Sequence, residues 1–249
     1  MGKLFTVVIL LLSFSFSKAQ FSTNKIEVRL GYNLHNVHAK RFNYLVNSFN
    51  DERYPHIVSQ NLPNLNWMHG LALGVEYAWR DDLQFHAVLK SRRQYIEAPY
   101  VDPAWYRSYL FRQHTLELGG SWVMKEEGRF SHRIGGGLLL GVLGVFTDWS
   151  ENSGYEGSRD MATIDHNLTL GLSLHYEARY HLHENVHFFL RPVAQYSLNS
   201  QVRRLTDFFA PQVVEGEIVY GTGAAVKYDI GSLSGLGLEG GIVFVLPEL

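Results

Sequence analysis

The chain has 249 residues, with 22 Lys and Arg against 24 Asp and Glu, and it contains no cysteine. The formal net charge of −2 offers no polybasic surface for nucleic acid, and the missing cysteine excludes disulfides and a lipid anchor on cysteine. Stability must therefore come from backbone pairing and packing alone.

Residues 1–19 have the pattern of a secretory signal peptide. Lys3 supplies a basic start, Leu4 to Phe16 is apolar, and the small residues around Ala19 suit cleavage after that position. The longest later apolar run, Ile134 to Phe146, is shorter than the roughly 20 residues of a spanning helix. We expect residues 20–249 to form one domain, because no composition shift or repeat divides them.

Alternation of apolar and polar residues with a period of two is the dominant pattern of this domain. In residues 166–180, for example, Leu170, Leu172 and Leu174 share one face of an extended chain, and the residues between them share the other. We predict strands at 24–32, 68–79, 83–95, 108–123, 131–146, 166–180, 186–198, 216–230 and 236–246. Because bacterial single-chain barrels have even strand numbers, we expect about 8–10 strands, that is, eight or ten rather than these nine.

The predicted connections alternate in length. The short ones are 80–82, 125–130, 181–185 and 231–235, and the long ones are 33–66, 96–107, 147–163 and 199–215. This asymmetry is typical of a closed antiparallel β-barrel that spans a membrane, with the short turns on one side.

The first long loop contains a predicted helix from His38 to Asn50. Phe42, Leu45, Val46 and Phe49 follow the spacing of one apolar helical stripe. Two interpretations stay open: the helix caps the rim of the barrel, or it is a docking surface for a partner or for lipid.

Aromatic residues near the strand ends favour a membrane barrel over a soluble, lipocalin-like barrel. Two rows are predicted, because amphipathic rings prefer the headgroup level. The row at the short-turn ends comprises Tyr77, Trp79, Trp122, Tyr176, Tyr180 and Tyr228, and the row at the long-loop ends comprises Tyr32, Tyr95, Tyr196 and Tyr220. The opposite face is rich in small residues, as a narrow interior requires: Gly70, Ala72, Gly74, Gly135, Gly137, Gly221 and Gly223.

Together these features resemble small outer-membrane β-barrel proteins of Gram-negative bacteria, of the eight-to-ten-stranded type. The last strand, Leu236 to Leu246, looks like the insertion signal that the barrel-assembly machinery reads, although the chain ends Leu246, Pro247, Glu248, Leu249 rather than on an aromatic residue. The resemblance implies location in the cell outer membrane, contact with outer-membrane lipids and lipopolysaccharide, and insertion by that machinery.

Ser173, His175 and Glu177 lie on one face of one predicted strand and suggest a nucleophile, a base and an orienting carboxylate. Same-face neighbours on a strand are about 6.6 Å apart, which makes direct hydrogen bonds between them marginal. No nucleophile elbow accompanies them. We interpret them as polar residues lining the lumen, and we assign no catalytic residue.

Two clusters suggest metals. His181, His183 and His187 with Glu184 crowd a short turn, where imidazoles could share a metal or simply face water. Asp148, Glu151, Glu156, Asp160 and Asp165 surround Arg159 in a long loop, where carboxylates could hold Ca²⁺ or be solvated. Neither spacing matches a known ligand set, so we expect no metal and no cofactor.

Charged residues on the polar rows are predicted to meet inside the barrel: Glu76, Glu117, Arg133, Glu177, Arg179, Arg191, Lys227 and Glu239. An interior of about eight strands is just wide enough for its side chains. We therefore expect a filled, salt-bridged lumen and little conductance.

The sequence predicts a non-enzymatic outer-membrane barrel with an envelope-structural, adhesive or accessory role through its long extracellular loops. A protein partner is expected at 33–66 and 147–163, and no nucleic acid. The alternatives are a small-solute channel and an outer-membrane lipid or peptide hydrolase.

Overall fold

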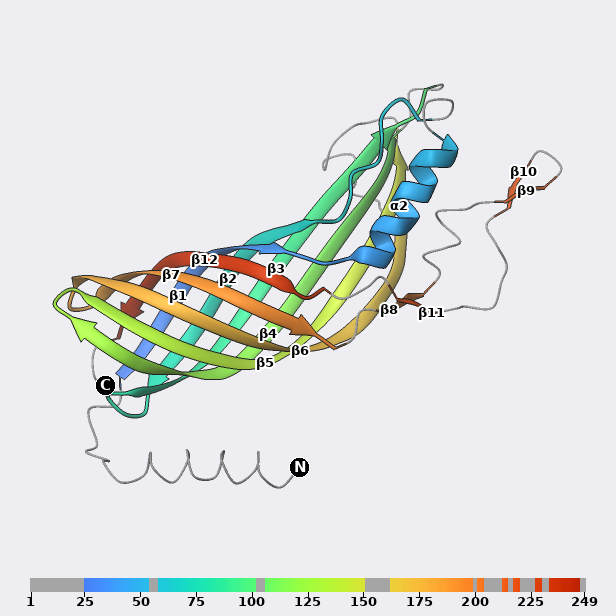
Figure 1. Ribbon diagram of the computed structural model, residues 1–249. Helices are drawn as coiled ribbons and strands as arrows, with labels where there is room; N and C mark the ends of the chain where they lie inside the picture. The colour runs from blue at the N-terminus through green and yellow to red at the C-terminus, as the bar shows by residue number, and fades with distance from the viewer. Residues whose placement is uncertain are drawn as a thin grey trace.

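The computed structural model describes residues 25–53, 58–101, 106–150, 162–198, 201–203, 212–214, 217–219, 227–229 and 233–246; the predicted signal peptide lies outside them. Eight antiparallel strands form a closed barrel in the order β1-β12-β7-β6-β5-β4-β3-β2 (Figure 1). The strands are β1 (Lys25–Asn36), β2 (Trp67–Ala78), β3 (Leu83–Pro99), β4 (Tyr106–Glu127), β5 (Phe130–Ser150), β6 (Ala162–His183), β7 (Val186–Ser197) and β12 (Gly235–Val245). The predicted all-β barrel of about 8–10 strands, with a short helix α2 (Lys40–Arg53) in the first long connection, is confirmed.

Closure depends on β12, which pairs on both sides. It runs against β1 from Glu27↔Val245 to His35↔Gly237 and against β7 from Gly235↔Gln195 to Phe244↔Val186. Such pairing leaves no free sheet edge, which is what a sheet inside hydrocarbon requires. Across the described residues, no helix has the length and apolar character needed to cross a membrane.

The predicted barrel strand at 216–230 and the predicted short turn at 231–235 are wrong. Within that stretch, β10 (Glu217–Val219) pairs with β9 (Gln212–Val214), and β11 (Lys227–Asp229) pairs with β8 (Gln201–Arg203), in two small sheets outside the barrel. Because β12 already occupies the edge of β7, no place remains for another strand between them. Lys227 and Tyr228 are therefore not on the barrel wall, while Tyr220, Gly221 and Gly223 lie outside the described residues.

The asymmetry of the connections is confirmed. Short turns join β2 to β3, β4 to β5 and β6 to β7, and Gly128 in the second of them has the positive φ of 60° that a tight hairpin favours. Two of the predicted long loops, 96–107 and 147–163, are shorter in the structure. The first is shortened because β3 continues to Pro99 and β4 begins at Tyr106. The second is shortened because β5 continues to Ser150 and β6 begins at Ala162.

A belt of exposed apolar side chains surrounds the barrel. Leu168 and Leu174 are each 70% exposed, and Leu172 between them is 48% exposed, whereas their inward neighbours are buried. Aromatic rings face outward at both limits of the belt, which confirms the predicted rows at Tyr77, Trp122, Tyr176, Tyr32 and Tyr196. Those at the short-turn limit are Tyr77, Phe85, Trp122, Phe130, Tyr176, Phe188 and Phe244, and those at the other limit are Tyr32, Trp67 and Tyr196. A continuous apolar belt of this extent, bordered by aromatic rings around a closed barrel, is the lipid-facing surface of an outer-membrane barrel.

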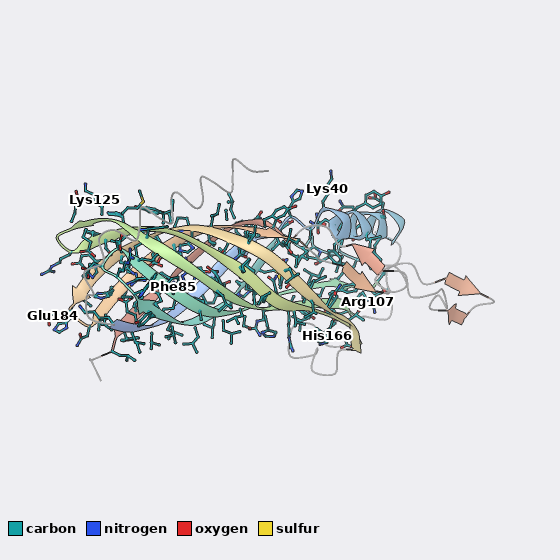
Figure 2. The ribbon with its side chains drawn as sticks, turned by 90° about the horizontal axis from the view of Figure 1, so that it is seen from below. Lys40, Phe85, Arg107, Lys125, His166 and Glu184 are labelled. Carbon is teal, nitrogen blue, oxygen red and sulfur yellow. The ribbon has the colours of Figure 1, made fainter. Side chains whose placement is uncertain are left out.

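Beyond the belt, β3, β4 and β5 invert their polarity on the inner face. β4 has 22 residues and β6 has 22, about twice the 9–11 that cross a membrane. Polar residues such as Arg93, Arg112 and His166 replace leucines at several outward positions, while the inward positions of β3, β4 and β5 become apolar. In Figure 2, Lys125 and Glu184 lie at the short-turn end, and Lys40, Arg107 and His166 lie at the opposite end.

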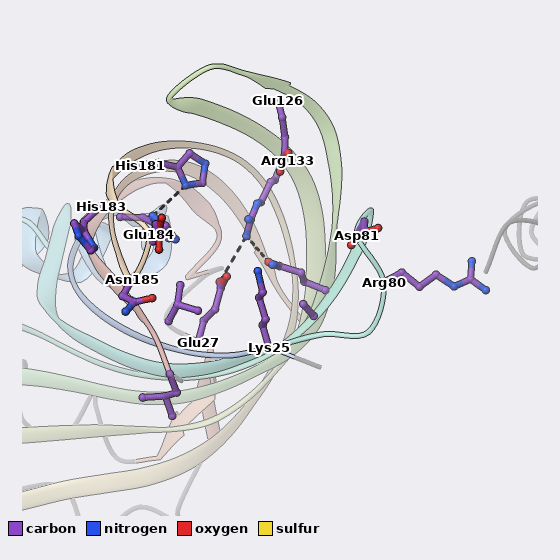
Figure 3. Close-up of a pocket in the computed structure, with 15 residues that line it drawn as sticks. Lys25, Glu27, Arg80, Asp81, Glu126, Arg133, His181, His183, Glu184 and Asn185 are labelled. Atoms are coloured by element: carbon purple, nitrogen blue, oxygen red, sulfur yellow. Dashed lines mark hydrogen bonds and ion pairs between the residues drawn. The ribbon is translucent and has the colours of Figure 1, made fainter. Parts of the chain in front are cut away.

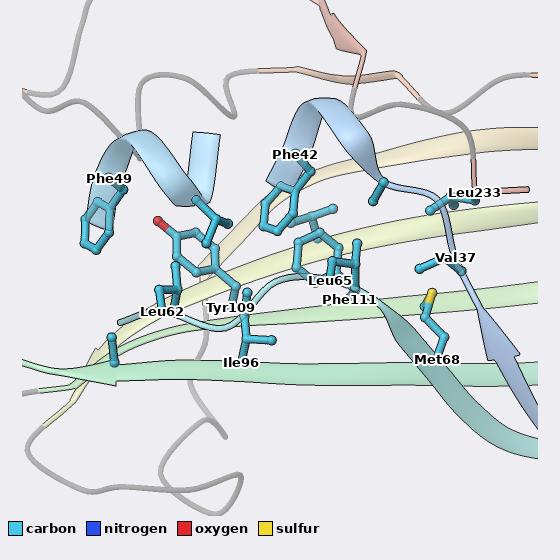
Figure 4. Packing of buried hydrophobic residues seen from close by; sticks show 14 of the residues in the cluster. Val37, Phe42, Phe49, Leu62, Leu65, Met68, Ile96, Tyr109, Phe111 and Leu233 are labelled. Atoms are coloured by element: carbon cyan, nitrogen blue, oxygen red, sulfur yellow. The ribbon is translucent and has the colours of Figure 1, made fainter. Parts of the chain in front are cut away.

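Helix α2 covers the apolar inner face of these extensions (Figure 4). Its buried stripe is Phe42, Val46 and Phe49, and the ring of Phe42 meets Phe111 of β4 edge-on at 4.7 Å between centroids. The rest of the cluster includes Ile96, Tyr109, Leu143 and Val145 from β3 to β5, Met68 from β2, and Val58, Leu62 and Leu65 from the chain that leads into β2. The helix begins and ends slightly later than the predicted 38–50, and the capping interpretation is correct for its buried face.

The belt assignment can be tested at Leu172. Replacing Leu172 with Arg places a charge on the lipid face near mid-belt and should lower the free energy of unfolding in lipid vesicles by about 2–4 kcal/mol. The matched control is Leu182→Arg, at an exposed position beside the short turn, where we expect about 0–1 kcal/mol. Denaturant titration followed by tryptophan fluorescence gives both values. Equal effects at the two positions would show that the belt is misplaced.

Candidate functional site

The lumen contains a dense set of buried charges on the inward rows of the strands. Among the described residues of the membrane half, the carboxylates are Glu27, Glu76, Glu117, Glu177 and Glu239, and the cations are Arg29, Lys90, Arg92, Arg133, Arg179 and Arg191. Burying a charge is unfavourable unless a partner of opposite sign compensates it, so the pairing of these groups determines what the lumen can do.

One cluster lies toward the short turns. Arg179 donates to three carboxylates, those of Glu27, Glu76 and Glu177, with 2.5 Å between Nη1 and Glu27 Oε2. Arg29 bridges two of the same carboxylates, at 2.6 Å to Glu76 and 2.6 Å to Glu177, and its guanidinium lies 4.1 Å from the ring centroid of Phe189. Shared forks of this kind give charge-assisted bonds that join β1, β2 and β6 across the lumen.

A second cluster surrounds Glu117 of β4. Its carboxylate lies 2.6 Å from Lys90 Nζ, 2.9 Å from Arg191 Nη2 and 3.1 Å from His86 Nε2. Lys90 also pairs with Glu239 of β12, which is 3.5 Å from Arg191 Nη1. These contacts connect β3, β4, β7 and β12.

The lumen has little space around these clusters. A Cβ added at Gly74 would lie 3.1 Å from Arg29 Cδ, and one added at Gly135 would lie 2.6 Å from His175 Nε2. Small residues on the inner face therefore leave room for the long charged side chains opposite them. The predicted filled, salt-bridged interior is confirmed in its geometry.

The membership of the network differs in part from the prediction. The prediction that Lys227 lies in the lumen is wrong, because its strand is outside the barrel. The buried lysine of the network is Lys90. Glu27, Arg29 and Arg92 were missed. The sequence pattern that places Glu27 and Arg29 on the inner face was present, since these residues alternate with Val28 and Leu30 in the first strand.

Ser173, His175 and Glu177 all face the lumen but do not form a catalytic set. Ser173 Oγ donates to the carbonyl of Gly137 at 3.4 Å, and His175 Nδ1 lies 2.6 Å from Arg191 Nη2. Glu177 is held by Arg29 and Arg179. Each member thus has a different partner, as the spacing along the strand predicted.

The two metal hypotheses have different outcomes. His181 Nδ1 lies 3.0 Å from His187 Nδ1, and His181 Nε2 lies 3.1 Å from Ser131 Oγ, while His183 and Glu184 are exposed on the turn. Within the described ranges, no three His, Cys, Asp or Glu side chains are arranged to hold a metal ion. Of the acidic loop, Asp148 is in β5 and Asp165 in β6, and Glu151, Glu156, Arg159 and Asp160 lie outside the described residues.

A cavity of about 790 Å³ opens at the short-turn end, and we call it the vestibule (Figure 3). It is lined by Lys25, Glu27, Ala78, Arg80, Asp81, Gln84, Glu126, Arg133, His181, His183, Glu184, Asn185, His187, Val245 and Leu246. Arg133 is its buried cation. The guanidinium donates to Gln84, and Nη1 lies 3.9 Å from the carboxylates of both Glu27 and Glu76.

Neither a family model nor a curated protein sequence matches the chain, but solved structures do. The outer membrane protein OprG from Pseudomonas aeruginosa is 9% identical, with a TM-score of 0.50 over 91% of this chain and 97% of that one. Ail, the attachment invasion locus protein of Yersinia pestis, is 12% identical, with a TM-score of 0.44 over 90% and 100%. The outer membrane protease OmpT from Escherichia coli is 8% identical, with a TM-score of 0.36 over 92% and 99%. At such identities the likeness concerns the fold, and the fold is that of outer-membrane β-barrel proteins.

The ion network makes a testable prediction about coupling. Glu177→Gln should destabilise the barrel by roughly 3–5 kcal/mol, because Arg29 and Arg179 lose a shared buried carboxylate. Arg29→Met should act similarly. The double variant should be less destabilised than the two single effects added together, since no stranded partner remains between them. Denaturant unfolding of the four proteins measures the coupling, and strict additivity would contradict a direct Arg29–Glu177 interaction.

Proposed function

We propose that this chain is a non-enzymatic barrel of the outer membrane that holds an extracellular binding platform in place, with an adhesive or accessory role in the envelope. The observation that carries the proposal is the inverted polarity of β3, β4 and β5 beyond the belt. These strands continue past the lipid and, with α2, enclose an apolar core of their own. In outer-membrane barrels the end opposite the short turns is extracellular.

The platform presents one exposed stripe of α2. Lys40, Tyr44, Asn47 and Asp51 face away from the buried stripe, and Tyr44 is 69% exposed. A groove of about 410 Å³ runs beside the first half of the helix, lined by Asn36, Val37, His38, Ala39, Lys40, Asn43, Tyr44, Asn47 and Asn66. An aromatic ring beside amide groups offers both stacking and hydrogen bonds to a polar partner.

A row of basic side chains supports contact with the phosphates of lipopolysaccharide. His69, Arg93 and Arg112 are cross-strand neighbours that face outward at the upper limit of the belt. Arg112 lies over Phe146, whose ring meets His166 of β6 at 5.4 Å. Guanidinium groups at the headgroup level are suited to bidentate contact with phosphate oxygens. Insertion by the barrel-assembly machinery remains part of the proposal.

The channel alternative leads to a prediction about conductance. Because the buried clusters fill the lumen, we expect the purified protein in planar bilayers to give no large, steady ion current. A porin reconstituted in the same bilayers serves as the positive control. Stable currents through the wild-type chain would instead support the small-solute channel.

The hydrolase alternative would require a nucleophile beside a base. Ser173 and His175 each contact a different partner, which argues against their acting together as nucleophile and base. Turnover of phospholipid or peptide substrates by the purified barrel, lost on Ser173→Ala, would overturn the non-enzymatic part of the proposal.

The adhesive role can be tested by display on a non-adherent Gram-negative host. Cells carrying the wild-type chain should aggregate or attach to immobilised proteins or polysaccharides. The triple variant Lys40→Ala, Tyr44→Ala, Asn47→Ala should reduce this attachment by about tenfold, because it removes the exposed stripe and leaves the buried one intact. Counting attached cells gives the measurement.

The control is a triple variant at the opposite end, Lys125→Ala, Glu126→Ala, Glu127→Ala, in the exposed hairpin of β4 and β5. It should attach like the wild type. Migration on gels before and after boiling confirms that each variant is folded. Equal loss in both triple variants, or no attachment by the wild type, would contradict an adhesive role for α2.

A further inference from the structure

The groove beside the first half of α2 is lined by amides rather than by charges. Its asparagines are Asn36, Asn43, Asn47 and Asn66. Lys40 supplies the one formal charge of the lining, and the two apolar members, Val37 and Ala39, are buried. A highly charged ligand would lack partners of opposite sign in this groove, and an apolar ligand would cover amides that need hydrogen bonds.

Hydrogen bonds within the platform fix the orientation of these amides. Asn36 Nδ2 donates to the carbonyl of Asn66 at 3.1 Å, which leaves Asn36 Oδ1 as an acceptor. Asn43 is held by Leu65, whose N–H donates to Oδ1 at 2.8 Å and whose carbonyl accepts from Nδ2 at 3.1 Å. Asn43 Nδ2 also lies 3.3 Å from Asn66 Oδ1, which leaves Asn66 Nδ2 as a donor. The groove therefore presents one acceptor and one donor whose directions are set by the backbone.

Helix α2 adds an exposed aromatic ring and a further amide to the same groove. Tyr44 is 69% exposed, and Asn47, one turn later, is also exposed. Among the described residues neither side chain has a hydrogen-bond partner, so both are available to a ligand. The buried Phe42 and Val46 hold the helix against the barrel, so the ring of Tyr44 is carried on a rigid support.

We propose that this groove binds a neutral sugar unit of a glycan, with one face of the sugar ring against Tyr44 and its hydroxyl groups bonded to the amides of Asn36 and Asn66. A sugar hydroxyl both donates and accepts, so adjacent hydroxyls match a fixed acceptor beside a fixed donor. The aromatic face offers a large apolar surface to the C–H groups of the ring. The volume of about 410 Å³ falls within the roughly 300–1,000 Å³ typical of ligand sites. This inference rests on the proposed function, since it names the class of ligand that the platform holds.

Binding of the purified barrel to an array of immobilised oligosaccharides tests the proposal. The array carries neutral chains of hexoses and of N-acetylhexosamines, with sulfated and sialylated chains for comparison. The detergent is a polyoxyethylene ether, because the sugar headgroup of a maltoside would compete for the groove. We expect saturable binding to at least one neutral chain. Calorimetric titration with that chain in solution then gives the Kd of each variant.

Two substitutions remove the two kinds of contact separately. Tyr44→Ala should weaken binding by about tenfold or more, because the aromatic surface is lost. Asn66→Asp should weaken it by about fivefold, because an acceptor replaces the donor Nδ2 while the other oxygen still accepts from Asn43.

Each substitution has a matched control. Tyr44→Phe keeps the ring and should bind within about threefold of the wild type. Asn61→Asp makes the same change as Asn66→Asp at an exposed position outside the groove, and its affinity should stay within about twofold. The shift in gel migration on boiling shows that each variant is folded.

The inference is wrong if no neutral chain saturates, if binding requires sulfate or sialic acid, or if Asn61→Asp weakens binding as much as Asn66→Asp. The failure of the inference and that of the adhesive role give different results. Cell attachment that depends on Lys40, Tyr44 and Asn47, without binding of any neutral chain, would overturn the sugar site and leave the adhesive platform. Saturable binding of a neutral chain without cell attachment would overturn the adhesive role and leave the sugar site.

Discussion

The hydrocarbon core of a membrane offers no water to the backbone, so every N–H and C=O of a spanning segment must be paired within the protein. The pairing of β12 with both β1 and β7 meets this requirement, because it closes the sheet. Closure with eight strands makes the lumen narrow, and the narrow lumen accounts for the glycines opposite Arg29 and His175. It also accounts for the shared ion pairs, because charges that cannot reach bulk water must be compensated by one another.

The same strands meet two environments along their length. Within the belt, leucines face lipid and charges face the lumen, whereas beyond it arginines and histidines face outward and an apolar core forms beneath α2. The change occurs without a break in strand pairing, since β3, β4 and β5 remain in register across it. One continuous sheet therefore serves both as the membrane anchor and as one wall of a unit folded in water. The charged clusters lie between that unit and the vestibule, so they separate the two ends of the lumen.

The sequence spacing of Ser173, His175 and Glu177 suggested a catalytic set, but the residues that contact them from other strands determine what each one does. Ser173, His175 and Glu177 share a face, but each is held by a different group: the carbonyl of Gly137, Arg191, or the pair Arg29 and Arg179. The lumen charges were largely predictable, because alternation determines which residues face inward. Which carboxylate pairs with which arginine was not predictable, since the contacts cross the barrel between residues as far apart in sequence as Glu27 and Arg179.

By itself, the sequence determined what depends on local order. The alternation of residues established the strands and their faces, the turn lengths established the two ends, and the stripe of Phe42, Val46 and Phe49 established the buried side of the helix.

The tertiary structure alone decided the strand count and the pairing of the buried charges in the lumen. Residues 216–230 alternate as a barrel strand does, but the pairing of β12 with β7 excludes them from the wall and removes Lys227 from the lumen. The alternation of apolar and polar residues indicates only that a segment has two different faces. Whether a barrel has room for that segment, and which charges meet in its lumen, depends on closure, which involves every strand at once.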